Sequence, residues 1–173
     1  MISIGFGSII NVPGDNNITI QQGIDMAQEG DTVLVAQGTY YENLIIEKEI
    51  TLASLAIYDN LSNWVEFTVE WNLTENADNI ANTIIDGSND INGEQFQSVI
   101  LINSPENQCI APIIIGFTIT GGDGTRGDIE SDQGMVEKIL GGGIFSNNAL
   151  PEMHYNYFHD NDGDADNGSI DEG

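Results

Sequence analysis

The sequence predicts an all-β chain that folds as a right-handed parallel β-helix, a solenoid of stacked short strands capped by a short N-terminal helix. Two observations carry this prediction. Short runs rich in Ile, Val and Leu recur along the chain, and Gly, Asn, Asp or Ser bound each run. After residue 27 the gaps between the runs show no helical period, and most are longer than a two-residue hairpin turn. Strands joined in this way favour stacked coils that share one apolar core.

Residues 19–28 are the segment expected to form the helix. Ile20, Ile24 and Ala27 recur at helical spacing, and Thr19 with Gln22 makes a capping-box pattern. The Gly30-Asp31 pair then predicts a turn before the first strand of the repeating series.

The expected β-helix occupies residues 1–159, and two segments interrupt it. Residues 55–82 form an excursion rich in aromatic side chains, and residues 121–142 form an acidic, Gly-rich insertion. Residues 160–173 form an Asp-rich calcium loop or tail. The expected strands lie at 32–36, 43–46, 50–53, 83–87, 99–103, 113–119, 143–145 and 153–158.

The charge of the chain restricts its partners. Three basic residues stand against 28 acidic ones, which gives a formal net charge of −25. Such a surface disfavours nucleic acid, which needs clustered Lys and Arg, and favours divalent cations. No run approaches the roughly 18 apolar residues that membrane insertion requires. Low Lys with abundant Asp, Asn and Gly favours a secreted or cell-surface protein, although a halophilic cytoplasm also favours acidic residues.

The Asp-rich run near the C-terminus is the strongest metal signal. Carboxylates at alternate positions allow a looped backbone to direct several oxygens at one Ca²⁺ ion. The spacing resembles an EF-hand loop only in part, because Ala165 stands where glycine is required and an Asp stands where Glu is usual. The alternative is a solvated acidic tail. The candidate ligands are Asp160, Asp162, Asp164, Asp166 and Asp171.

A weaker metal site is expected in the insertion between Gly121 and Gly142. Its acidic residues lie close together in a Gly-rich segment that also holds Arg126, which could instead contact an acidic sugar. The alternative for Arg126 is a surface ion pair, which contributes little to stability. The candidate ligands are Asp123, Asp128, Glu130 and Asp132.

Trp64 and Trp71 are candidates for carbohydrate binding, together with Arg126. Sugar rings stack on flat aromatic faces, and both Trp residues lie in the excursion at 55–82. The alternative is that these rings cover the flank or the end of the solenoid.

Residues 19–43, TIQQGIDMAQEGDTVLVAQGTYYEN, resemble the opening of secreted right-handed parallel β-helix proteins of the pectate-lyase-like superfamily. Residues 83–87, 116–122 and 141–145 resemble successive coils of such chains. The resemblance implies a capping helix, a first coil and many coils after it. In members that cleave polysaccharide, catalytic acids and a base lie on the outside of central coils, and those coils are expected to be missing here.

These observations favour a non-catalytic extracellular module that is stabilised by calcium. Its expected role is in cell-surface structure or self-assembly, with contact to glycans. The alternative is a fragment of a secreted polysaccharide lyase or glycoside hydrolase. The expected partners are calcium, polysaccharide, and either a second copy bound head to tail or further coils of a parent chain, because an uncovered last coil leaves unpaired backbone groups.

Overall fold

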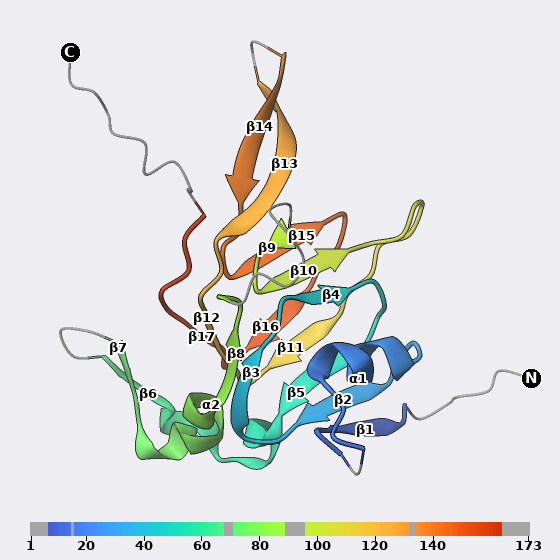
Figure 1. The fold of residues 1–173 in the computed structure, drawn as a ribbon. Helices are drawn as coiled ribbons and strands as arrows, with labels where there is room; N and C mark the ends of the chain where they lie inside the picture. The colour runs from blue at the N-terminus through green and yellow to red at the C-terminus, as the bar shows by residue number, and fades with distance from the viewer. Residues whose placement is uncertain (1–6, 15, 68–70, 89–95, 132–133, 164–173) are drawn as a thin grey trace, which may run out of the picture.

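The structure is a computed structural model that describes residues 7–14, 16–67, 71–88, 96–131 and 134–163. Most of its regular structure is β-strand, with a few short helices (Figure 1). This confirms the prediction of a mainly β chain. Within those ranges, no helix has both the length and the apolar character needed to cross a membrane.

Three parallel sheets form the body of the molecule. Sheet A holds β1 (Ile9–Val12), β2 (Thr32–Val35), β5 (Thr51–Ser54), β11 (Ile113–Ile115) and β16 (Glu152–His154), in that order across the sheet. Sheet B runs from β3 (Gly38–Tyr41) through β8 (Thr83–Asp86) and β12 (Thr118–Thr120) to β17 (Tyr157–Phe158). Sheet C runs from β4 (Leu44–Ile46) through β10 (Ile100–Asn103) to β15 (Ile144–Asn147).

The chain visits these sheets in a fixed rotation. The strands β2, β3 and β4 lie in sheets A, B and C, and the next two sets follow the same order: β5, β8 and β10, then β11, β12 and β15. A further set begins with β16 and β17. We call each set a circuit. Each new strand pairs in parallel with the equivalent strand of the circuit before it.

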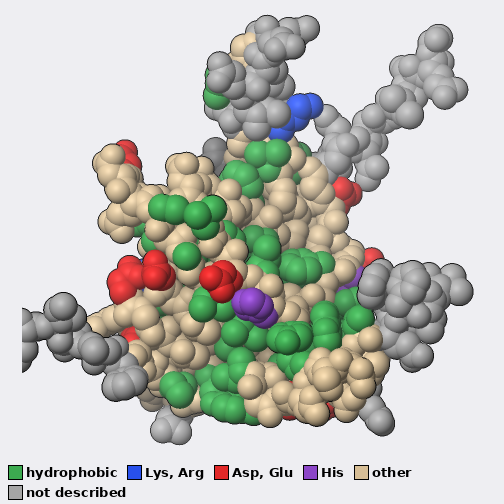
Figure 2. Space-filling view, turned by 180° about the vertical axis from the view of Figure 1, so that it is seen from behind, with side chains coloured by type: hydrophobic (Ala, Val, Ile, Leu, Met, Phe, Trp, Pro, Cys, Tyr) green, Lys and Arg blue, Asp and Glu red, His purple; other side chains and the backbone are tan. Residues whose placement is uncertain are grey.

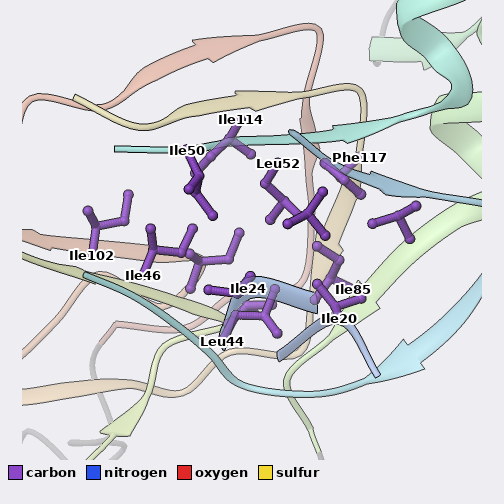
Figure 3. Packing of buried hydrophobic residues seen from close by; sticks show 14 of the residues in the cluster. Ile20, Ile24, Leu44, Ile46, Ile50, Leu52, Ile85, Ile102, Ile114 and Phe117 are labelled. Atoms are coloured by element: carbon purple, nitrogen blue, oxygen red, sulfur yellow. The ribbon is translucent and has the colours of Figure 1, made fainter. Parts of the chain in front are cut away.

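The strand register aligns equivalent side chains of successive circuits in columns. In sheet A, Val33, Leu52 and Ile114 form one column, and all three are fully buried. In sheet B, Ile85 and Ile119 form another. Side chains from all three sheets and from the first helix point into one core (Figure 3). Burial alternates along β4, β8 and β11, which fits the period of two in a strand, whereas β2, β5 and β10 are buried at three consecutive residues.

Helix α1 (Ile20–Met26) covers one end of this core. Thr19 and Gln22 make the predicted capping box, and Ile20 and Ile24 are buried against the strands. The Glu42 carboxylate accepts hydrogen bonds from the Ile20 and Gln21 amides, both at 3.0 Å. These bonds satisfy N–H groups that have no partner within the helix.

Lys48 stabilises the other end of α1. Its ammonium group donates hydrogen bonds to the carbonyls of Ile24, Asp25 and Ala27 at 2.8–3.0 Å. A cation at this position satisfies carbonyls at the helix C-terminus and complements the helix dipole. One of the three basic residues of the chain thus holds the cap in place.

Asp31 ties the turn after α1 to the start of β1. Its carboxylate accepts hydrogen bonds from the Ser8 amide at 2.6 Å and the Gln28 amide at 2.8 Å. The bonds from Gln28 and Ser8 favour the ionised form and lower the pKa of this carboxyl. The turn predicted at Gly30-Asp31 is therefore also an anchor for the first strand.

Two segments leave the sheets. Between β5 and β8 lie η1 (Leu55–Tyr58), η2 (Leu61–Asn63), the antiparallel pair β6 (Val65–Phe67) and β7 (Trp71–Leu73), η3 (Glu75–Ala77) and α2 (Asp78–Asn82). Between β12 and β15 the strands β13 (Gly124–Ser131) and β14 (Gly134–Leu140) form an antiparallel hairpin that projects from the body (Figure 1). The short strand β9 (Phe96–Gln97) pairs with β13.

Candidate functional site

The outer face of sheet C carries two columns of side chains. One column is apolar and contains Ile45, Leu101 and Phe145, which the register places side by side on β4, β10 and β15. The second column lies two residues further along the chain and consists of Glu47 just after β4, Asn103 at the end of β10 and Asn147 at the end of β15. Adjacent strands in a sheet lie about 4.8 Å apart, so both columns repeat at that interval.

Hydrogen bonds connect the polar column. Asn147 donates from Nδ2 to Oδ1 of Asn103 at 3.0 Å, and Asn103 donates from Nδ2 to Oε1 of Glu47 at 3.3 Å. Each amide group has two N–H donors, and the ladder uses one of them. The column is therefore held in a fixed orientation and still has capacity for a ligand.

The base of the β13–β14 hairpin lines one side of these columns, and together they form a groove of about 400 Å³. Its wall contributes Thr125, Arg126, Gly127 and Leu140. A Cβ atom placed on Gly127 would lie 3.2 Å from Leu140 Cδ1 and 3.9 Å from Phe145 Cζ. The absence of a side chain at Gly127 thus keeps the space above Phe145 open.

Buried contacts hold the base of the hairpin. The hydroxyl oxygens of Ser98 and Thr125 lie 2.6 Å apart, and both residues are buried. Gly122 precedes the hairpin and Gly142 follows it, and a Cβ on Gly122 would lie 2.0 Å from the Gly142 carbonyl oxygen. A Cβ on Gly142 would lie 2.2 Å from the carbonyl oxygen of Asp162. Glycine at both positions lets three backbone segments stack closely under the hairpin.

The residues predicted for the main calcium site are described only in part. Asp160 and Asp162 lie directly after β17, whereas Asp164, Asp166 and Asp171 lie outside the described residues. The Asp160 side chain is 88% exposed, and its Oδ2 lies 2.9 Å from Nδ1 of His159. Within the described part of the chain, no three acidic, His or Cys residues are grouped so that they could hold a metal ion.

The residues predicted for the second metal site lie along the hairpin. Asp123 is exposed just before β13, Asp128 and Glu130 lie in β13, and Asp132 lies outside the described residues. The register pairs Asp128 with Glu137 of β14, so two acidic residues stand opposite each other. Arg126, from the same strand, lines the groove.

Of the predicted carbohydrate residues, Trp64 and Trp71 lie in the segment between β5 and β8, whereas Arg126 lies in β13. Trp64 is half-buried and packs against the small cluster of Ala56, Ala77 and Ile80. Its ring meets the ring of Tyr155 edge to face, with centroids 5.8 Å apart. Trp71 lies in β7, and its side chain lies outside what the structure describes. The contacts of Trp64 favour the alternative to carbohydrate binding, in which the ring covers the flank of the body.

No family model matches the chain, and no curated protein matches it significantly. The groove on sheet C must therefore be interpreted from its own residues.

Among the residues of this groove, the sequence predicts only Arg126 as a site residue. The missed residues are Phe145, Asn103 and Asn147, with Glu47 at the far end of the ladder. A signal for them was present, because the segments ILIN and IFSN both end in Asn and occupy consecutive circuits. Finding the groove also required the hairpin fold, which brings residues 125–127 over strands that are distant in sequence.

Proposed function

We propose that the chain is a non-catalytic, secreted or cell-surface module built as a right-handed parallel β-helix, and that the groove on sheet C binds a glycan. The fixed rotation through sheets A, B and C supports the β-helix, because each circuit stacks on the one before through parallel pairing. Right-handedness is the general rule for connections between parallel strands. The resemblance of residues 19–43 to the pectate-lyase-like superfamily agrees with this fold.

An apolar column and a polar column lie side by side next to the base of the β13–β14 hairpin, and this arrangement supports glycan binding. Phe145 offers an aromatic face for a sugar ring, and Ile45 and Leu101 continue the apolar strip. Asn103, Asn147 and Glu47 present amide and carboxylate groups for hydroxyls beside that strip. Binding sites commonly combine an apolar lining with a few oriented polar groups in this way.

Charge favours a neutral glycan over an acidic one. The groove contains one carboxylate, Glu47, and one guanidinium, Arg126, so its local charge is close to balanced. The whole chain carries a formal charge of −25, which repels polyanions at low salt. In this proposal Arg126 donates hydrogen bonds to the oxygens of a neutral sugar. Its expected contact with an acidic sugar is less favoured.

Binding to a neutral oligosaccharide tests this proposal. Cello- and xylo-oligosaccharides are titrated by calorimetry against the intact chain, with oligogalacturonate as the acidic comparison. We expect binding to a neutral probe that Phe145→Ala weakens about tenfold, equivalent to about 1.4 kcal/mol. Gly127→Val is expected to weaken binding because the new side chain narrows the groove. Gly127 does not have a positive φ, so the backbone conformation at this position accepts a side chain.

The control is Tyr58→Ala, which removes an aromatic ring that is 67% exposed and outside the groove. Equal losses from Phe145→Ala and Tyr58→Ala would contradict the groove as the binding site. Release of new reducing or unsaturated ends from any probe, abolished by Arg126→Ala, would favour the lyase or hydrolase alternative.

We also propose that calcium stabilises the module through the loop of Asp160, Asp162, Asp164, Asp166 and Asp171. The high negative charge supports this proposal, since a bound cation relieves repulsion among carboxylates. A ligand that binds only the folded chain adds about 2.7 kcal/mol of stability at a hundredfold excess over its Kd. We therefore expect millimolar calcium to raise the melting temperature, and Asp162→Ala with Asp164→Ala to remove most of that increase.

Magnesium and added NaCl are the controls, because general screening of charge raises stability without a specific site. The calcium site would be overturned if calcium, magnesium and NaCl of matched ionic strength raised the melting temperature equally, and if the double variant showed the same increase.

A further inference from the structure

The final circuit leaves one end of the strand stack open among the described residues. The strands β15, β16 and β17 each stand at the edge of their sheet. Met153 and Phe158 continue the buried columns of sheets A and B, yet they are 49% and 43% exposed. Seen from behind, hydrophobic side chains gather over a broad area of the molecule (Figure 2). Backbone edges and apolar side chains are thus exposed together at this end.

This last circuit is itself firmly held. Asn156 accepts a hydrogen bond from the Phe117 amide at 3.0 Å and donates to the Ile114 carbonyl at 2.8 Å. Asn161 accepts from the Gly122 amide at 3.1 Å and donates to the Ile119 carbonyl at 2.8 Å. Its edge is therefore a formed template to which another parallel strand can add.

The opposite end of the stack is closed in sheet C and open in sheet A. The Gln21 side chain pairs with the outer edge of β4, accepting from the Ile45 amide at 2.8 Å and donating to its carbonyl at 3.2 Å. In sheet A, β1 lies beyond β2 and forms the edge. Ile9 on β1 and Met26 on α1 are 57% and 61% exposed, so this end also presents apolar side chains.

Charge distinguishes these two ends from the rest of the surface. Although 28 of 173 residues are acidic, residues 1–14 contain no charged side chain. Residues 141–159 contain one carboxylate, Glu152, and two His residues. Proteins commonly place charges on exposed edge strands to prevent them from pairing, and these two edges nearly lack that protection. For a chain of charge −25, strand edges with few charged side chains reduce the repulsion between two copies that meet there.

We propose that a second copy of this chain binds end to end, with β1 of one copy pairing in parallel with β16 of the other. Continuing the sheet A register places Ile10 beside Met153 and Asn11 beside His154, because Ile10 occupies the column of Val33, Leu52, Ile114 and Met153. The apolar column then runs without interruption from one copy into the next. Contacts between unlike ends leave a free edge at each end of the assembly, so the chains form open filaments.

Disulfide trapping tests the register of this junction. In a Cys109→Ser background, which removes the exposed native thiol, Asn11→Cys is combined with His154→Cys. Neighbouring strands lie about 4.8 Å apart, within the Cα separation that a disulfide spans. We expect mild oxidation in 1 M NaCl, where charge is screened to about 3 Å, to give a ladder of covalent multimers on a non-reducing gel.

The matched control replaces Glu152 instead of His154, with Asn11→Cys retained. Glu152 is exposed on the same strand but pairs with the position of Ile9, two residues away from Asn11. Two residues along a strand add about 6.6 Å, which puts the thiols beyond disulfide reach. We expect at least fivefold less of the trapped multimers. Equal trapping by both pairs would overturn the register.

Light scattering on the unsubstituted chain tests assembly without any new cysteine. We expect its mass to rise with protein concentration and with NaCl. Met153→Asp is expected to keep the chain monomeric, because it places a charge at an exposed position on the edge strand. A chain that remains monomeric at millimolar concentration in 1 M NaCl would overturn the proposal. Glycan binding by the monomeric Met153→Asp chain is expected to be unchanged, so the groove and the junction succeed or fail separately.

Discussion

Replacing Ile114 with Ala is expected to lower the free energy of unfolding by about 2–5 kcal/mol, which is the usual cost of truncating a fully buried Ile. Ile114 is 0% exposed and lies in the column between Leu52 and Met153. Its neighbours in the column, Leu52 and Met153, belong to the circuits before and after it. Truncation of the Ile114 side chain therefore leaves a cavity that borders three circuits. The measurement is urea unfolding followed by circular dichroism.

Ile113→Ala is the matched control, because Ile113 is the preceding residue of the same strand and is only half-buried. We expect this change to cost about 1 kcal/mol or less, since exposed and half-buried positions lose less apolar contact on truncation. Equal costs at the two positions would contradict the assignment of inner and outer faces in sheet A.

Gly142→Ala is expected to destabilise the chain by about 1–3 kcal/mol or more, the usual range for overpacking. The added Cβ would lie 2.2 Å from the Asp162 carbonyl oxygen and 2.9 Å from the Gly122 carbonyl oxygen. Both neighbours are backbone atoms, so no side-chain rotation relieves the contact. Because Gly142 supports the base of the β13–β14 hairpin, we also expect weaker glycan binding by the folded variant.

Gly163→Ala provides the comparison. A Cβ on Gly163 would lie 3.7 Å from the nearest atom outside its chain neighbours, the Gly142 amide nitrogen, which is an ordinary contact distance. Neither glycine has a positive φ, so the two variants differ in crowding rather than in backbone preference. If thermal unfolding shows the same melting temperature for both variants, the close stacking at Gly122 and Gly142 is wrong.

The sequence predicts the local parts of the fold well where a single residue pattern determines the structure. The capping box at Thr19 and Gln22, the buried face of α1 and the turn at Asp31 all follow from short spacings. Parts that depend on distant contacts were not predictable in this way. The Lys48 ammonium caps α1 from more than 20 residues away, and no local pattern in the helix indicates it.

The candidate site also depends on contacts between residues that are distant in sequence, which local patterns do not predict. Carboxylates close together in sequence, as in the Asp-rich run, predict a site for one cation, whereas the groove is built from residues that are far apart in sequence. Asn103 and Asn147 are 44 residues apart and meet only because one strand register aligns them. Trp64 is a sugar-stacking candidate by residue type, whereas its half-buried ring packs against the small core of Ala56, Ala77 and Ile80, as the alternative predicts.

An NMR titration of the ¹⁵N-labelled chain with a neutral oligosaccharide tests whether a glycan binds in the groove on sheet C. We predict saturable shifts at the amides of residues 101–103 and 145–147 and at the side-chain amides of Asn103 and Asn147, which line the groove. Shifts centred on Trp64 and its neighbours, or none for neutral and acidic probes alike, would contradict the claim.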